Sequence, residues 1–230
     1  MRVLALESSS LVAGIAVLDG SSLVYEGYSH HKRNHSQTLM PMIEYALATS
    51  EIELADIDII AVTNGPGSFT GLRIGISTVK GLAQASDKRV VAIPTLDSLA
   101  HNVTRFPGLV CPIMDARREQ VYTCIYKWQN TGYKKLMSYS AMHIHELVEE
   151  ILDLGQPVIF LGDGVAKYKD LLKERLGGQM DIAPAHLCLQ RASTTAWMAQ
   201  NYASSNRPIT YYELEPFYLR KSQAEQAKSD

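Results

Sequence analysis

The sequence of 230 residues contains only three cysteines, which are far apart and form no CxxC pair. We therefore expect Cys111, Cys124 and Cys188 to be reduced and mostly buried thiols. No apolar run approaches the roughly 18 residues that indicate a transmembrane helix. The first expected strand begins at Arg2, which leaves no room for a signal peptide. Together these absences predict a cytoplasmic protein.

Neither sign of charge dominates the sequence, since 22 lysines and arginines stand against 24 acidic residues. This balance argues against a protein that binds nucleic acid alone, because neutralising phosphates requires a basic surface. The local basic candidates are Arg117, Arg118, Lys167, Lys169, Lys173 and Arg175. We interpret them as solvated surface. The hydrophobic fraction of 46 % permits a sizeable core and argues against wholesale disorder.

A glycine-rich segment, TNGPGSFTGLRIG at 63–75, lies between an expected strand and an expected helix. A phosphate-binding P-loop requires the spacing GxxxxGK[ST], with its lysine and closing hydroxyl. This segment has neither that spacing nor the lysine. We therefore interpret the segment as a tight turn that allows helices to pack closely, and not as a phosphate site.

The order of expected elements repeats once along the chain. In the first half we expect strands at 3–6, 12–18 and 23–28, a helix from about 36, a strand at 57–62, a helix at 71–86, a strand at 89–93 and a helix to about 103. In the second half we expect strands at 109–114, 120–128 and 135–140, a helix at 143–154, a strand at 157–161, a helix at 165–176, a short strand at 181–183 and a last helix at 193–204. Pro41 either opens the first helix or kinks it.

This order predicts an α/β protein with two lobes of βββαβα type, the architecture of the actin, Hsp70 and sugar-kinase (ASKHA) superfamily. We expect an N-terminal lobe at 1–106, a degenerate second repeat at 107–206 and a C-terminal tail at 207–230 that is frayed from Lys221.

An ATP site of the usual kind in that architecture needs glycine in the turns that hold the phosphates. The first expected turn, 6–10, has no glycine, and the second, 114–118, has bulky residues. The glycines at 161–164 are interrupted by Asp163, whose charge disfavours nearby phosphates. Glu7 and Asp115 could still form a metal and general-base pair, but without phosphate contacts we do not favour it.

Two histidine pairs have spacings that could serve a metal. His31 and His35 are four residues apart but lie where a strand becomes a helix. His143 and His145 are two apart at a helix start and should point apart. We interpret both pairs as incidental and predict no catalytic, nucleotide or metal residues.

Several motifs resemble the TsaB (YeaZ) family. They are residues 32–37 (KRNHSQ) followed by Leu39, Pro41 and Met42, residues 64–75 (NGPGSFTGLRIG), 115–117 (DAR), 119–122 (EQVY), Pro216 and 218–220 (YLR). The run at 65–75 is highly specific, the first lobe matches best, and little beyond element order matches between 130 and 210. One departure is Glu7, where many relatives have aspartate.

The resemblance implies a bacterial protein of the pathway that forms N6-threonylcarbamoyladenosine at position 37 of tRNAs reading codons that begin with A. In that family TsaD transfers the threonylcarbamoyl group from threonylcarbamoyl-AMP, with TsaB and the ATPase TsaE as required partners. TsaB is a relative of TsaD without the chemistry. TsaD-like proteins carry HxxxH metal ligands, and here Asp97 stands in place of the first histidine while His101 is kept.

We therefore expect a non-catalytic subunit that binds TsaD and TsaE, forms a homodimer without TsaD, contacts tRNA only indirectly and binds no cofactor alone, the metal and ATP being on its partners. The alternatives are an ATP-dependent phosphotransferase of the sugar-kinase kind and a metallopeptidase-like protein. The missing glycines argue against the first and the broken HxxxH against the second.

The first two expected helices carry more apolar positions than one sheet should cover. We therefore predict a partner surface on them, formed by Leu39, Met42, Ile43, Leu47, Gly71, Leu72, Gly75, Ile76 and Val79. In this interpretation Gly71 and Gly75 let a neighbouring helix of TsaD, or of a second copy, approach closely. The alternative is that the lobe buries both helices within itself.

Overall fold

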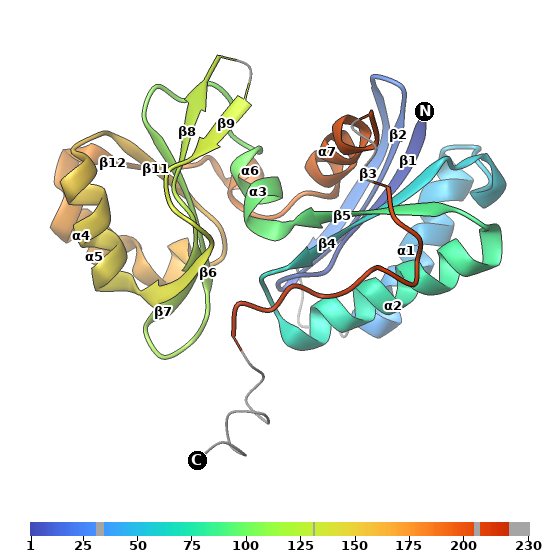
Figure 1. Ribbon diagram of the computed structural model, residues 1–230, viewed down its shortest axis with the longest axis horizontal. Coiled ribbons are helices and arrows are strands. Elements are labelled where there is room, and N and C mark those ends of the chain that lie inside the picture. Colours follow the sequence, from blue (N-terminus) through green and yellow to red (C-terminus); the bar gives the residue numbers. More distant parts are fainter. Residues whose placement is uncertain (31–34, 131, 205–207, 221–230) are drawn as a thin grey trace. The chain divides into compact units, whose positions relative to one another are not determined.

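The computed structural model describes residues 1–30, 35–130, 132–204 and 208–220 (Figure 1). It divides into two compact units. The first contains Met1–Ser98 and Gln190–Phe217, and the second contains Leu99–Leu189 together with the described residues from Tyr218 to Arg220. This division differs from the expected boundaries near 106 and 206, because the last helix returns to the first unit. The tail expected to fray from Lys221 lies outside the described residues.

The first unit is built on a five-stranded sheet with strand order β3-β2-β1-β4-β5. Its elements are β1 (Arg2–Glu7), β2 (Val12–Asp19), β3 (Ser22–His30), α1 (His35–Thr49), β4 (Ile59–Gly65), α2 (Phe69–Ser86), β5 (Arg89–Pro94), the start of α3 (Thr95–Ala100) and α7 (Ala192–Ser204). β1, β2 and β3 are antiparallel neighbours, whereas β1, β4 and β5 run parallel. Pro41 lies inside α1 and so does not open it.

Both faces of this sheet are covered. Leu4 and Leu6 of β1 belong to a core shared with α1 and α2, whereas Val3 and Ala5 belong to a second core shared with α7. Alternate side chains of a strand point to opposite faces, so two covering layers explain why β1 is apolar without interruption. Figure 1 shows α7 on one side of the strands and the α1–α2 layer on the other.

The second unit repeats the same strand order as β10-β7-β6-β11-β12. Its elements are the end of α3, β6 (Leu109–Asp115), β7 (Gln120–Thr123), β8 (Tyr126–Gln129), β9 (Gly132–Lys135), β10 (Ser140–His143), α4 (Ile144–Leu154), β11 (Val158–Leu161), α5 (Val165–Leu176), β12 (Met180–Ile182) and α6 (Ala185–Cys188). Two units with one common order confirm the two-lobed actin/Hsp70/sugar-kinase-like (ASKHA) α/β fold.

Two strand predictions in the second unit were wrong. The strand expected at 120–128 is two strands, because β7 pairs with the end of β6 while β8 pairs with its beginning. The strand expected at 135–140 is replaced by β9, which forms a hairpin with β8, and by β10, which pairs with β7. Figure 1 shows the β8–β9 hairpin extending beyond the other strands of this unit.

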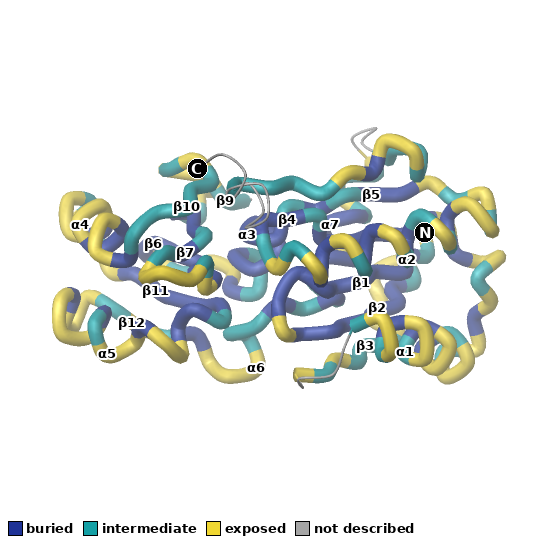
Figure 2. Tube along the Cα trace, turned by 90° about the horizontal axis from the view of Figure 1, so that it is seen from below, coloured by how far each residue is buried: buried dark blue, intermediate teal, exposed yellow. Residues whose placement is uncertain are grey.

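The burial pattern follows the layers. Most strands are buried, and the helices expose one side to solvent (Figure 2). Among the described residues the three cysteines form no disulfide, with Cys111 and Cys124 buried and Cys188 half-buried. Among the described helices, none combines the length and apolar character needed to cross a membrane.

Candidate functional site

The glycine-rich loop that joins β4 to α2 packs against the backbone of its own unit. A Cβ atom added to Gly67 would lie 2.2 Å from the carbonyl oxygen of Ser9, and one added to Gly65 would lie 2.1 Å from that of Phe217. The Ser68 amide donates a hydrogen bond of 2.7 Å to the same Ser9 carbonyl. The close approach that only glycine permits is therefore used by the chain itself.

Ser68 also begins the following helix. It is the N-cap residue of α2, and its hydroxyl accepts a hydrogen bond of 3.2 Å from the Gly71 amide. An N-cap serine satisfies one of the amides that the first turn of a helix leaves without a partner. The loop thus fixes both the start and the position of α2.

Gly71 and Gly75 of α2 face the turn that follows β1. The Ser8 hydroxyl donates a hydrogen bond of 3.0 Å to the Gly71 carbonyl. Added Cβ atoms would lie 2.1 Å from the Ser8 carbonyl oxygen at Gly71 and 2.1 Å from the Ser8 hydroxyl at Gly75. The two glycines therefore allow close approach within the unit, and the approach of a partner's helix at these positions stays a prediction.

The structure places most of the predicted partner surface inside the first unit. The buried members are Leu39, Ile43, Gly71, Leu72, Gly75, Ile76 and Val79. Met42 and Leu47 are half-buried and pack against the same core. The buried side chains are excluded from the exposed surface because α1 and α2 share one face of the sheet and each covers part of the other. At these seven positions the lobe buries the two helices within itself, as in the alternative stated in the sequence analysis.

The exposed side of α2 has a different composition. Its exposed residues are Thr70, Arg73, Ser77, Gly81, Gln84 and Ala85. Only Arg73 among them is charged, and a Cβ added at Gly81 meets no atom within 4 Å. On α1 the exposed residues include Met40, at 41 % relative exposure, and Tyr45, at 63 %. We call these outward positions of the two helices the α1–α2 outer face.

Glu7, the last residue of β1, is fully buried. One of its carboxylate oxygens accepts hydrogen bonds from the amide (2.7 Å) and the hydroxyl (2.5 Å) of Ser9. Burial raises the pKa of Glu7, and the hydrogen bonds from Ser9 offset this only in part. The other carboxylate oxygen, Oε2, is buried and has no hydrogen-bond partner among the described residues. The hydrogen bonds that Glu7 accepts from Ser9 thus lie within a single turn of the first unit.

Asp115, the suggested partner of Glu7, lies in the second unit at the end of β6. Its carboxylate accepts a hydrogen bond of 2.9 Å from the Lys167 ammonium and one of 3.0 Å from the Arg117 amide. Asp163 accepts a hydrogen bond of 3.2 Å from the Asp115 amide, and burial raises its pKa to about 6. Both carboxylates are engaged within their own unit.

The remaining metal candidates have other contacts. Asp97 is buried in α3, and the His101 ring packs edge-on against Tyr133 with centroids 5.1 Å apart. His35 makes a 2.7 Å hydrogen bond with the Ser10 carbonyl, whereas His31 lies outside the described residues. Across the described ranges, no three His, Cys, Asp or Glu side chains gather so as to hold a metal ion.

His143 and His145 do not point apart as expected. Their rings are stacked with centroids 5.3 Å apart, and His143 Nε2 lies 3.2 Å from a carboxylate oxygen of Glu119. The expectation assumed that both residues lie within a helix, but His143 is the N-cap residue of α4 and has an extended backbone.

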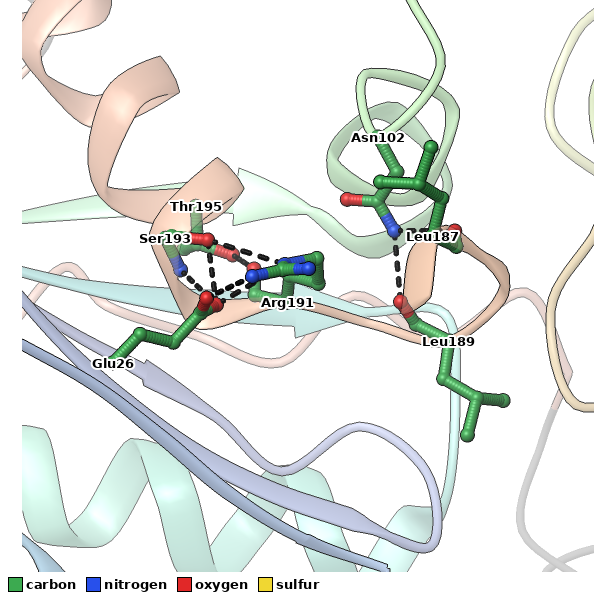
Figure 3. A network of polar contacts seen from close by, with 7 residues as sticks. All are labelled: Glu26, Asn102, Leu187, Leu189, Arg191, Ser193 and Thr195. Carbon is green, nitrogen blue, oxygen red and sulfur yellow. Dashed lines mark hydrogen bonds and ion pairs between the residues drawn. The ribbon is translucent and has the colours of Figure 1, made fainter. Parts of the chain in front are cut away.

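Sequence reasoning missed the polar network that holds α7 on the first unit (Figure 3). The Glu26 carboxylate on β3 forms an ion pair with Arg191 and accepts hydrogen bonds from the amide (3.2 Å) and hydroxyl (2.5 Å) of Ser193. A carboxylate at this position also stabilises the amino end of a helix. Because Glu26 and Ser193 are 167 residues apart, no local pattern could have revealed the contact.

A second network lies in the other unit, just before this helix in the chain. The Asn102 side-chain amide donates to the carbonyl oxygens of Leu187 (3.0 Å) and Leu189 (2.8 Å), as Figure 3 also shows. These bonds fix the segment from which the chain returns to the first unit.

The fold defines an ASKHA-type protein, and its glycine-rich loop packs against the backbone of its own unit. The family model of TsaD, tRNA N6-adenosine threonylcarbamoyltransferase, matches residues 29–228. The tRNA threonylcarbamoyladenosine biosynthesis protein TsaB of Bacillus subtilis is 32 % identical over 98 % of this chain and 96 % of its own length. That of Escherichia coli is 29 % identical over 97 % and 96 %.

Solved structures agree with these relatives. A Pseudomonas aeruginosa protein described as similar to the peptidase YeaZ is 26 % identical, covers 95 % of this chain and 99 % of its own, and superposes with a TM-score of 0.80. YeaZ from the same organism, at 24 % identity and with the same coverage, has a TM-score of 0.75 and supports the fold. The chain belongs to the TsaB (YeaZ) family, within the wider TsaD-like group, and its role lies in the biosynthesis of threonylcarbamoyladenosine in tRNA.

Proposed function

We propose that this protein is a non-catalytic subunit that binds and activates a TsaD transferase. With TsaE, the complex would transfer the threonylcarbamoyl group from threonylcarbamoyl-AMP to N6 of adenosine 37 in tRNAs that read codons beginning with A. The observation that carries this proposal is the internal use of every candidate catalytic group. Glu7 and Asp97 are buried, and Asp115 is bound by Lys167. Metal and ATP then belong to the partners.

We place the partner contact on the α1–α2 outer face. This face combines exposed apolar side chains such as Met40 with small residues such as Ser77 and Gly81, and it carries little charge. The half-buried Met42 and Leu47, predicted from the sequence, border it. Interfaces of this kind are depleted in charge at their centre. A stable contact would bury roughly 1,200–2,000 Å² in total.

The match to the TsaD family model supports the choice of this face. If two related lobes present equivalent helices, the face that pairs this chain with TsaD can also pair two copies of the chain. The copies would then form an isologous homodimer when TsaD is absent. Binding to TsaD and self-association would compete for one surface.

The test is Gly81→Arg, compared with Gly178→Arg as a matched control. A Cβ atom at either glycine meets nothing within 4 Å, so both variants should fold. Gly178 lies in the second unit and is no part of the α1–α2 outer face. We expect Gly81→Arg to weaken TsaD binding at least tenfold and to lower tRNA modification in parallel, while Gly178→Arg behaves as wild type. Normal TsaD binding by a folded Gly81→Arg variant would remove this face from the proposal.

A further inference from the structure

One part of the second unit has a composition unlike the rest of the chain. No aspartate or glutamate occurs between Glu119 and Glu146, although the chain has 24 acidic residues. Within this segment β8 and β9 form a hairpin that carries Lys127, Lys134 and Lys135. We call this element the lysine hairpin.

The lysine hairpin is held in place by an aromatic cluster. The Tyr133 ring packs edge-on against Trp128, Tyr126 and His101, with centroids 5.1, 5.9 and 5.1 Å apart. Its hydroxyl donates a hydrogen bond to the carbonyl of Val103. Edge-on aromatic packing of this kind stabilises beyond the area it buries. The backbone that presents the lysines is therefore fixed before any ligand arrives.

The placement of the lysines opposes the stability of the hairpin. Lys127 of β8 lies directly opposite Lys134 of β9 in the antiparallel register. Like charges at directly opposed positions destabilise a sheet, since their Cβ atoms are only about 4.5–5.5 Å apart. An anion shared by the two ammonium groups would relieve this repulsion.

Lys127 and Lys135 both contact neutral side chains. Lys127 donates a hydrogen bond of 2.7 Å to the neutral side chain of Gln156, and Lys135 lies over the Tyr139 ring, 3.9 Å from its centroid. Two members of the basic clusters noted in the sequence instead contact carboxylates. Lys167 pairs with Asp115 at 2.9 Å, and Arg175 pairs with Glu149.

We infer that the lysine hairpin binds the phosphate backbone of the tRNA while the chain is part of the transferase complex. This inference rests on the proposed function, which brings the chain to tRNA. Two or three ammonium groups with no acidic neighbour in the segment suit a phosphate backbone, which attracts them without sequence readout. The contact is auxiliary, because the overall charge of the chain is −2. It replaces the expectation of a purely indirect contact.

The test compares Lys134→Glu/Lys135→Glu with Lys169→Glu/Lys173→Glu, a control on α5 with the same change of charge. All four lysines are exposed. Each variant is assembled with TsaD, and binding of an unmodified tRNA transcript is measured across a series of salt concentrations. We expect the hairpin variant to bind the tRNA about tenfold more weakly at low salt, with a salt slope reduced by roughly 1.5–2, and the control to change little.

Two further measurements decide the cause. Lys134→Arg/Lys135→Arg keeps the charge and should keep the affinity for tRNA. The inference is overturned if the hairpin and control variants behave alike, or if the hairpin variant loses TsaD instead of tRNA. It is also overturned if that variant self-associates at unchanged affinity for tRNA, since the lysines would then only protect an edge strand. Failure of the wild-type chain to bind TsaD contradicts the proposed function instead.

Discussion

Replacement by alanine should change the stability of the protein differently at three glycines of α2, because their surroundings differ. Gly71 faces the Ser8 carbonyl, Gly75 faces the Ser8 hydroxyl, and Gly81 faces open space. The same added methyl group therefore meets backbone, a side chain or nothing. All three positions lie within Phe69–Ser86, so the change in helix propensity is similar for each.

The magnitudes follow from the two opposing contributions. Alanine in place of glycine stabilises a helix interior by about 1 kcal/mol. At Gly81 this gain stands alone, so Gly81→Ala should raise the free energy of unfolding by about 0.5–1 kcal/mol. At Gly75 the added Cβ would lie only 2.1 Å from the Ser8 hydroxyl oxygen, a clash that costs about 1–3 kcal/mol, and displacing the hydroxyl from its bond to the Gly71 carbonyl adds about 1 kcal/mol.

Gly75→Ala should therefore destabilise the protein by about 1–3 kcal/mol, and Gly71→Ala by more, because a carbonyl cannot rotate away as a hydroxyl can. Replacing Ser8 with alanine removes its hydroxyl and should relieve the destabilisation caused by Gly75→Ala. In the double variant Ser8→Ala/Gly75→Ala, the loss should be at least about 2 kcal/mol smaller than the sum of the two single losses, because the clash disappears and the hydrogen bond to Gly71 is lost only once.

Urea denaturation followed by circular dichroism measures these differences. The reasoning is refuted if Gly75→Ala is as stable as the wild type, if Gly81→Ala is destabilised, or if Ser8 and Gly75 act additively. Any of these results would mean that α2 does not pack on the β1–β2 turn as described.

Three further predictions concern buried and paired charges. Burial raises the pKa of Glu7 in the folded state. The contribution of Glu7 to the free energy of unfolding is therefore full below the usual pKa of glutamate and is lost as the pH rises through the folded pKa. Glu7→Gln should make the free energy of unfolding less dependent on pH in that range. Asp163, whose pKa is raised to about 6, should likewise stabilise the protein less as the pH rises. Asp163→Asn should therefore remove the decline in stability between about pH 4 and pH 6. Thermal denaturation at each pH measures this, and a decline that persists in the variant would contradict it. Glu26→Ala leaves Arg191 without its carboxylate and should cost about 3 kcal/mol, with limited proteolysis cutting near α7; unchanged resistance to protease would contradict this role.

The strands of both units were predictable because their apolar runs are continuous and bounded by turns. Residues 57–62 and 109–114 were assigned to buried strands, and β4 and β6 lie there. The position of α7 was not predictable. Its sequence indicates a helix, but the core that it joins on the far face of the first sheet, which includes Val3 and Ala5, comes from residues far away in the chain.

The candidate surface was predictable only in part. Apolar spacing in α1 and α2 correctly indicated two helices with much to bury, yet periodicity cannot say what buries each stripe. Leu39 and Ile76 proved to be covered by their own unit. Gly71 and Gly75 were recognised as positions of close approach, but the neighbour, Ser8, is 63 residues from Gly71.

Omission from the reconstituted reaction tests the central claim most directly. The complete mixture contains TsaD, TsaE, threonylcarbamoyl-AMP, ATP, unmodified tRNA and this chain, and formation of threonylcarbamoyladenosine is measured with each protein left out in turn. A non-catalytic but required subunit predicts full modification in the complete mixture, almost none without the chain, and none when the chain is the only protein. Equal modification by TsaD and TsaE without the chain, or modification by the chain alone, would contradict the account.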